Sequence, residues 1–304
     1  KRLTKLSTYF RTTHIHLCFS TFQMNILTID LEDWFHILDH PATERPDQWS
    51  GFESRLEKNV DRLLDLLDEH KQQATWFCLG WIAKQYPQVV KKVAAKHELA
   101  CHSDLHQLVY NQTPIAFKED TLNVIRRLED LSGKKMNAYR ASGFSITEKT
   151  SWAFEILSEC GITIDCSVFP ASRNHGGFEK FGTAQPCRIA VNGTFLKEFP
   201  LNTIRLFGKE IVFSGGGYFR ALPYSFIHSQ MKKSDYVMTY FHPRDFDPSQ
   251  PVLKSLPFKR RLMSYVGLQG ALPKFKKLLL DHSFVDLAKA DKQMNWEGSP
   301  IVYL

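Results

Sequence analysis

The sequence predicts an α/β fold in which parallel strands form a barrel or an open barrel. From residue 24 onward, short apolar runs of strand length alternate with longer stretches whose apolar residues recur at helical spacing. This alternation is typical of βαβ units, and five or more such units fit along the chain. Polar, titratable residues follow the apolar runs, as expected of barrels whose chemistry lies at the carboxyl ends of the strands.

The predicted elements follow one another in a regular order. The expected strands are residues 25–29, 74–79, 98–101, 136–140, 162–168 and 236–241. The expected helices are residues 52–70, 81–96, 114–131, 147–160 and 223–233. Leu56, Val60 and Leu63 lie on one face of the first helix, which predicts the side that packs on the sheet. Gly133 and Gly161 follow the third and fourth helices and are typical helix stops.

Two later regions depart from this rhythm. Residues 171–220 contain eight glycines and only short strand-like pieces, so we interpret them as a β-rich insertion or lid. Residues 251–304 follow the last predicted strand, and 258–280 are expected to form one or two helices. The sequence therefore predicts one domain over residues 24–250, including the insertion, and a basic C-terminal tail over 251–304 that packs on the barrel.

The first 23 residues show no periodic pattern and carry four basic residues and no acid. Met24 directly precedes the first predicted strand, so we interpret residues 1–23 as an extension upstream of a natural start at Met24. The alternative interpretation is a short basic arm that lies on a membrane surface.

The net charge of +7 is concentrated in two segments. Residues 1–23 contribute +4 and residues 251–280 contribute +7, which leaves −4 for the rest of the chain. This distribution argues against a general nucleic-acid-binding surface. The sequence contains no run of 18 apolar residues, so no transmembrane helix is predicted. Its six cysteines are scattered without a CxxC pair, which indicates reduced thiols in a cytoplasmic protein.

Two groups of candidate site residues follow the first and third predicted strands. Asp30, Glu32 and Asp33 place three carboxylates within four residues, which would repel one another unless a cation compensates them. His102 and His106 are spaced i, i+4, so they can share one face of a helical turn and converge on one metal ion.

Three further polar residues follow the remaining predicted strands. Arg140 comes after the strand over 136–140, and Asp165 comes after an apolar run beginning at residue 162. His242 follows the strand over 236–241. This repeated placement after strands favours a site assembled at one end of the sheet.

The order of these motifs resembles that of the polysaccharide deacetylases of carbohydrate esterase family 4, which share the NodB-homology domain. The resemblance covers roughly residues 24–247. Residues 28–33 resemble the first motif of the family, and residues 97–106, with the sequence HELACHSDLH, match the second. Residues 140–144 resemble the third motif with Ser142 in place of proline, Asp165 falls at the fourth, and residues 240–243 resemble the fifth. The segment from residue 242 to 267 resembles the bacterial subgroup associated with exopolysaccharide loci, near the peptidoglycan-deacetylase branch.

The resemblance implies a distorted (β/α) barrel of the NodB-homology type and metal-dependent hydrolysis of an N-acetyl group on a polysaccharide sugar. It implies a divalent metal, usually zinc, held by His102, His106 and one carboxylate. Asp30 is then the catalytic base and His242 the acid, while Arg140 holds Asp30 charged and oriented. Asp165 is expected to orient or tune His242.

The first motif departs from the family pattern, which has two adjacent aspartates. Strand register favours Glu32 as the carboxylate ligand because it lies on the same side as Asp30, whereas side-chain type favours Asp33. If Glu32 and Asp33 are the adjacent pair, Glu32 becomes the base. The metal ligands are therefore predicted as His102 and His106 with Asp33 or Glu32.

Two other functions remain open from the sequence. One is a cyclic-amide hydrolase of the allantoinase-like branch, and the other is an inactive carbohydrate-binding relative. In all three cases the expected partner is a small molecule or saccharide, not a nucleic acid.

The basic residues between 254 and 277 alternate with apolar ones. The simplest interpretation is a helical tail with a solvated basic face. The alternative is that this face contacts anionic lipid or holds an acidic polysaccharide near the metal. Contact with lipid would place the cytoplasmic protein at the periphery of the inner membrane.

Overall fold

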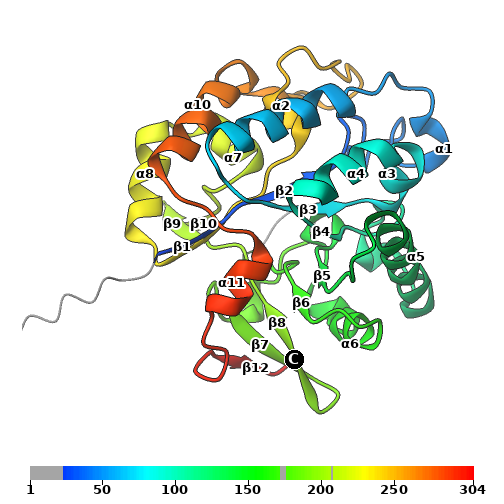
Figure 1. Ribbon diagram of the computed structural model, residues 1–304, viewed down its shortest axis with the longest axis vertical. Helices are drawn as coiled ribbons and strands as arrows, with labels where there is room; N and C mark the ends of the chain where they lie inside the picture. Colours follow the sequence, from blue (N-terminus) through cyan, green and yellow to red (C-terminus); the bar gives the residue numbers. More distant parts are fainter. Residues whose placement is uncertain (1–22, 172–175, 207) are drawn as a thin grey trace, which may run out of the picture.

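A computed structural model describes residues 23–171, 176–206 and 208–304 of the chain (Figure 1). Our interpretation of the N-terminal extension therefore lies outside the described residues, apart from Gln23. The strands are β1 (Met24–Ile26), β2 (Thr28–Leu31), β3 (Thr75–Cys78), β4 (Glu98–Cys101), β5 (Ala138–Tyr139), β6 (Ile164–Asp165), β7 (Cys187–Val191), β8 (Thr194–Glu198), β9 (Ile204–Leu206), β10 (Lys209–Ile211), β11 (Tyr236–Met238) and β12 (Ile301–Val302). The α-helices are α1 (Pro46–Trp49), α2 (Leu56–Glu69), α3 (Gly80–Gln85), α4 (Pro87–Lys96), α5 (Pro114–Ser132), α6 (Trp152–Glu159), α7 (Gly216–Ala221), α8 (Tyr224–Lys233), α9 (Phe258–Tyr265), α10 (Leu268–Asp281) and α11 (Leu287–Gln293).

Parallel strands form the centre of the molecule. The main sheet has the order β12-β7-β8-β6-β5-β4-β3-β2, and its strands β2 to β6 run parallel. On the other side, β1 pairs with β11 in parallel, and a bridge between Ile29 and Phe241 extends this pairing along β2. The carboxyl ends of β2, β4, β5 and β11 therefore lie at one edge of the curved arrangement.

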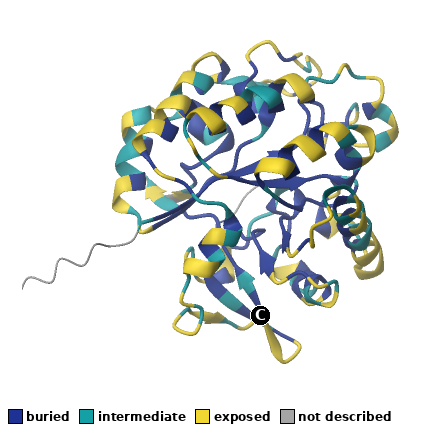
Figure 2. Ribbon diagram, viewed as in Figure 1, coloured by how far each residue is buried: buried dark blue, intermediate teal, exposed yellow. Residues whose placement is uncertain are grey.

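The two faces of the curved sheet are both apolar, as a sheet covered on both sides requires. Residues at alternate positions pack either against the surrounding helices or into the interior of the curve. The helix-facing set includes Ile29, Trp76, Leu99, Cys101 and Tyr139, and the interior set includes Phe77, Ala100, Ala138, Ile164 and Met238. Figure 2 shows the strands as a buried centre and the helices with exposed outer faces.

One predicted helix is divided in the structure, and the predicted helical tail forms two helices. The predicted helix over 81–96 is divided into α3 and α4, because Pro87 at the start of α4 has no amide hydrogen to continue the first helix. In the tail, the break falls at Gly267, whose φ of 72° favours glycine, while Pro273 lies inside α10. Phe275 and Leu278 of α10 are buried in the core, so this part of the tail packs on the barrel.

The region over 171–220 contains the antiparallel hairpin β7–β8, and β8 pairs in parallel with β6. This hairpin is therefore an extension of the main sheet and not a separate lid. The short pair β9–β10 follows it.

No described helix is both long and apolar enough to span a bilayer. The five described cysteines are unpaired, and four of them are buried.

Candidate active site

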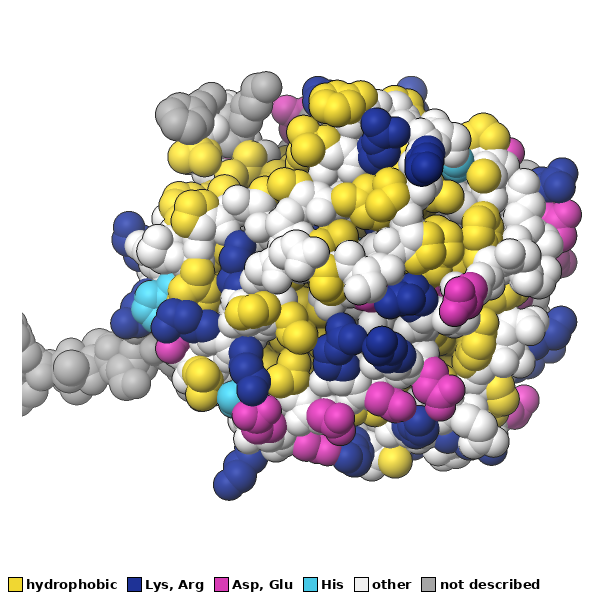
Figure 3. All heavy atoms as spheres, turned by 90° about the horizontal axis from the view of Figure 1, so that it is seen from above, with side chains coloured by type: hydrophobic (Ala, Val, Ile, Leu, Met, Phe, Trp, Pro, Cys, Tyr) yellow, Lys and Arg dark blue, Asp and Glu magenta, His cyan; other side chains and the backbone are white. Residues whose placement is uncertain are grey.

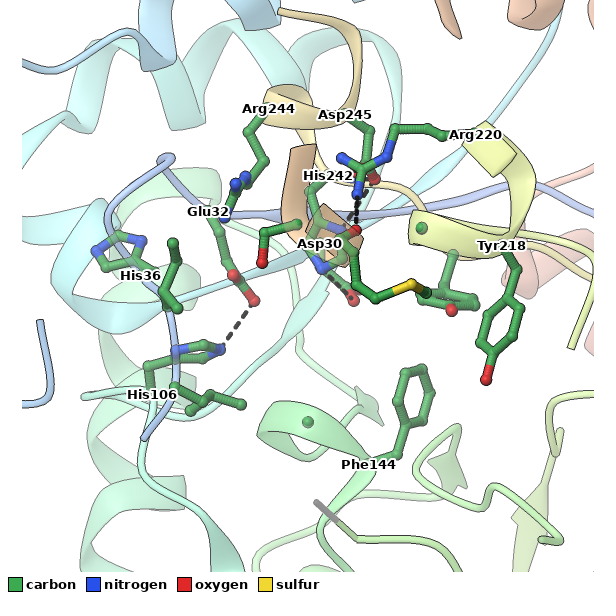
Figure 4. A pocket seen from close by; sticks show the side chains of 18 of the residues that line it. Asp30, Glu32, His36, His106, Phe144, Tyr218, Arg220, His242, Arg244 and Asp245 are labelled. Atoms are coloured by element: carbon green, nitrogen blue, oxygen red, sulfur yellow. Dashed lines mark hydrogen bonds and ion pairs between the residues drawn. The ribbon is translucent and has the colours of Figure 1, made fainter. Parts of the chain in front are cut away.

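A cleft of about 370 Å³ opens at the carboxyl ends of the strands (Figure 4). Its walls include Asp30, Glu32, His102, His106 and His242. These residues follow β2, β4 and β11, so parallel pairing brings together side chains that are more than 200 positions apart in the chain. The structure therefore unites most of the residues that the sequence singled out.

Glu32 and the two histidines form a compact donor set. The Oε1 atom of Glu32 lies 2.9 Å from Nε2 of His102 and 2.9 Å from Nε2 of His106. One carboxylate oxygen and two imidazole nitrogens within 4.8 Å of one another match the ligands of a divalent transition metal. Burial alone would raise the pKa of Glu32, but the charge of His106 and hydrogen bonds from both histidines lower it well below its usual value.

The two histidines converge through an irregular loop and not through the helical turn that their spacing suggested. Ser103 and His106 have φ angles of 67° and 53°, in the left-handed region. The Ser103 hydroxyl accepts a hydrogen bond from the backbone of His106 at 2.9 Å. The carboxylate of Asp120 on α5 accepts two more, from the backbone amides of Asp104 and Leu105. These bonds stabilise a strained conformation that brings both rings to one point.

Arg140 contacts both parts of the site. Its Nη1 donates to Oδ1 of Asp30 at 2.6 Å, and both side chains are buried. Its backbone carbonyl lies 2.8 Å from Nδ1 of His102. A carbonyl can only accept, so Nδ1 of His102 donates to it, and Nε2 is the ring nitrogen that faces Glu32.

His242 lies on the opposite side of Asp30 from Arg140. Its Nε2 is 3.7 Å from Oδ2 of Asp30, and its Nδ1 is 3.1 Å from Oδ2 of Asp245. Burial alone would lower the pKa of His242, but the hydrogen bond and charge of Asp245, together with Glu32 and Asp30, raise it to about 9. Arg220 donates to the other oxygen of Asp245 at 2.8 Å and holds that carboxylate in place. His242 is therefore a cation at neutral pH.

Asp33 lies apart from the donor set. Its carboxylate accepts hydrogen bonds from the Ser54 hydroxyl and from the backbone amide of Arg55 at 3.1 Å, just before α2. A carboxylate at this position is stabilised by the positive end of the helix dipole. Burial is the main cause of a raised pKa for Asp33. The structure thus brings Glu32, and not Asp33, to His102 and His106.

Asp165 also lies apart from His242. It is fully buried, and its carboxylate accepts hydrogen bonds from the hydroxyl and the backbone amide of Ser167 at 2.7 and 2.9 Å. It also faces the carboxyl group of Glu198 on β8. The residue that orients His242 is Asp245 instead.

The facing pair of Asp165 and Glu198 predicts an unusual dependence of stability on pH. Burial, and then the neighbouring charge of Asp165, raise the pKa of Glu198 well above its usual value. The folded protein therefore binds a proton that the unfolded chain releases above about pH 4.5. This group contributes stability at low pH that is lost as the pH rises, by up to about 1.4 kcal/mol for each pH unit.

Glu198→Gln is expected to remove that slope, because a glutamine amide donates to Asp165 without titrating. Urea unfolding at a series of pH values measures the effect. The free energy of unfolding of the variant should increase relative to that of the parent protein as the pH rises from 5 to 8. Glu198→Ala, which leaves a cavity, serves as the control and should be less stable at every pH. Parallel profiles for the parent protein and Glu198→Gln would show that Glu198 is ionised in the folded state.

Sequence reasoning missed four residues that line or support the cleft. These are Asp245, Arg220, Arg244 and His36. The spacing of three between His242 and Asp245 was a usable signal, because it allows the side chain of one to cap the other. His36 also lines the cleft, and its Nδ1 accepts the backbone N–H of Asp33 at 3.0 Å.

Arg220 had no comparable signal, because its position depends on a close approach between two backbones. Gly215 lies so near β11 that a Cβ atom there would be 1.9 Å from the carbonyl oxygen of Tyr240. Glycine at this position lets the start of α7 reach the cleft.

Two family models match the sequence. Residues 41–164 match a model described as "Polysaccharide deacetylase", and residues 166–292 match a model described as "Domain of unknown function (DUF3473)". No curated protein matches the sequence.

Several solved structures are similar to this chain, one of them with a TM-score above 0.5. A proposed polysaccharide deacetylase from Mycobacterium smegmatis is 18% identical, with 93% of each chain covered and a TM-score of 0.63. The Bc1960 peptidoglycan N-acetylglucosamine deacetylase is 17% identical, with 88% of this chain and 86% of the other covered and a TM-score of 0.46. A family 4 pseudoenzyme from Bacillus anthracis is 12% identical, with 93% of this chain and 64% of the other covered and a TM-score of 0.44. The first of these likenesses agrees with the predicted α/β fold of the NodB-homology type, which is confirmed.

Proposed function

Since the chain belongs to the polysaccharide deacetylase family, we propose that it hydrolyses an N-acetyl group on a sugar of a cell-surface or exported bacterial polysaccharide and releases acetate. The observation that carries this proposal is the donor set of Glu32, His102 and His106 beside the pair Asp30 and His242. This places a metal site, a carboxylate base and a cationic acid in one cleft.

Glu32, His102 and His106 are the residues that would hold the metal ion, and their chemistry favours zinc. The hydrogen bond from Nδ1 of His102 to the carbonyl of Arg140 supports this assignment, since it leaves Nε2 facing the ligand site. When bound, such an ion polarises an amide carbonyl and lowers the pKa of a water molecule.

The remaining steps belong to residues of this chain. Asp30, oriented by Arg140, accepts the proton of the attacking water. His242, kept protonated by Asp245, donates its proton to the leaving amine. Asp30 and His242 are neighbours in the cleft, with 3.7 Å between Oδ2 and Nε2, so both can reach the scissile amide.

Removal and return of the metal tests the proposal. The chelated protein should release no acetate from N-acetylglucosamine oligomers, and stoichiometric zinc should restore the release. Full activity without metal would contradict the metal-dependent mechanism. Ring opening of a cyclic amide without acetate release would favour the allantoinase-like function, and saccharide binding without cleavage would favour an inactive relative.

We also propose that the protein is cytoplasmic and contacts anionic lipid through α9. Phe258, Leu262 and Met263 are 74%, 54% and 47% exposed and alternate with Lys259 and Arg261. Figure 3 shows lysine and arginine side chains interspersed with hydrophobic ones over one face of the molecule. Exposed apolar and basic side chains on one short helix suit peripheral binding to an anionic surface.

Other basic residues of the tail are already engaged in the folded protein. Lys274 donates to the carbonyls of Phe219, Arg220 and Leu222, while Lys276 and Lys277 pair with Glu69 and Asp281. Co-sedimentation with anionic vesicles at low salt should therefore weaken in the double variant Phe258→Ser/Leu262→Ser. Equal sedimentation of the parent and this variant, or no sedimentation of either, would contradict contact through α9.

A further inference from the structure

Two arginines of the cleft, Arg244 and Arg260, have no carboxylate partner among the described residues. The walls include three carboxylates, Asp30, Glu32 and Asp245, and three arginines, Arg220, Arg244 and Arg260. Asp30 is paired with Arg140, and Asp245 with Arg220 and His242. Glu32 faces the two histidines of the donor set. These pairings leave Arg244 and Arg260 without a carboxylate partner in the part of the chain that the structure describes. Arg260 donates instead to the backbone carbonyls of Leu38 and Asp39, so Arg244 is the less satisfied of the two.

The guanidinium group of Arg244 is also short of hydrogen-bond acceptors. Its Nε and Nη2 atoms are buried, and neither has a partner among the described residues. The ring of Tyr265, whose centroid is 5.6 Å from the guanidinium carbon, is an aromatic neighbour and offers no carboxylate. A buried donor without an acceptor is costly, and such groups in a cleft are commonly satisfied by a ligand.

The position of Arg244 connects it to the reaction centre. It lies in the short helix η5 (Pro243–Phe246), one turn that also carries Asp245 and directly follows His242. Figure 4 shows its side chain directed from this turn toward Glu32, on the side of the cleft where His36 lies. A substrate whose acetyl group lies at the donor set would therefore place a neighbouring substituent within reach of Arg244.

We propose that Arg244 binds an oxyanion on the substrate, so that the enzyme prefers an acidic saccharide, and this inference rests on the proposed deacetylase function. The guanidinium fork matches a carboxylate or a phosphate through paired hydrogen bonds. A carboxylate would come from a uronic acid beside the N-acetylated sugar, and a phosphate from a phosphorylated sugar. Both supply a negative charge opposite a cleft-lining guanidinium group that has no carboxylate partner among the described residues.

Three probes of equal length separate these cases. They are an N-acetylglucosamine tetramer, a tetramer that alternates glucuronate with N-acetylglucosamine, and a phosphorylated N-acetylglucosamine tetramer. With the zinc-loaded protein at low salt, kcat/KM for at least one acidic probe should exceed that for the neutral probe about tenfold or more. The preferred acidic probe identifies the source of the oxyanion.

Arg244→Gln should reduce this preference to about one, whereas Arg244→Lys should retain part of it because the charge remains and the fork is lost. Arg126→Gln is the matched control, because Arg126 is exposed on α5 and does not line the cleft. It should keep the full preference. Metal content is measured for every variant, so that loss of zinc is not mistaken for loss of substrate binding.

Equal kcat/KM for all three probes, or a preference that survives Arg244→Gln, would overturn the role of Arg244 and leave the deacetylase function intact. If no probe releases acetate, calorimetric titration of the metal-free protein with the same probes decides the matter. Tighter binding of an acidic probe to the parent than to Arg244→Gln would retain the oxyanion site, even though the proposed function had failed. Equal binding to both proteins would overturn the site as well.

Discussion

Glu32→Gln is expected to remove bound zinc and to lower acetate release at least about a hundredfold, whereas Asp33→Asn is expected to keep both. Loss of groups that merely orient metal ligands costs 10–100-fold in affinity or activity, so loss of a ligand charge should cost at least as much. Glu32 is in contact with both histidines, and Asp33 instead accepts hydrogen bonds at the start of α2.

Metal analysis after dialysis and steady-state acetate release measure the two effects in the same samples. Asp33→Asn should lower the thermal stability of the protein, because it removes a negative charge from the amino terminus of α2. Zinc retained by Glu32→Gln and lost by Asp33→Asn would reverse the assignment of the carboxylate ligand.

His242→Ala is expected to lower kcat by about 10²–10⁴ without changing metal content, the usual range for loss of general acid catalysis. Its imidazole is 3.7 Å from Asp30 and is held as a cation by Asp245. Asp245→Asn should lower kcat by less, because the imidazole stays in the cleft with a lower pKa.

His228→Ala is a suitable control, since His228 lies on α8 against His282 and does not line the cleft. Its kcat should stay within about twofold of the parent value. The acid role of His242 would be excluded if His242→Ala kept its kcat or if the zinc were lost together with it.

Much of the site was predictable from the sequence because strand parity decides which side chains enter the interior. Positions 28, 30 and 32 lie on one side of the first strand, so Asp30 and Glu32 reach the cleft together. Asp33 has the opposite parity and belongs to the loop beyond β2. Its direction depends on residues 54 and 55, which no local pattern near position 33 reveals.

The same parity explains the placement of Asp165. Ile164 and Cys166 pack in the interior of the curve, so Asp165 between them points to the other face and meets Glu198. The expectation that functional residues lie at strand ends correctly placed Asp165 at the end of a strand. It did not take into account which side of the sheet its side chain faces. A parity check against Ile164 would have separated it from His242.

The residues that the sequence did not reveal depend on contacts between distant segments. Arg220 reaches Asp245 because α7 begins at glycines that approach Tyr240. The cleft wall that carries Arg220, Arg244 and Arg260 comes from the part of the chain after residue 165, where apolar periodicity is weakest. Local pattern predicts elements well, but it does not predict which loops meet above a sheet.

Arg140 makes the spacing between metal site and base a property of one residue. Its carbonyl orients His102, and its guanidinium orients Asp30. A displacement of Arg140 at the end of β5 should therefore move Asp30, the proposed base, together with His102, a proposed metal ligand, and keep the distance between them. A rearrangement of Arg140 is expected to disturb the proposed base and the proposed metal ligand together, although they come from different strands.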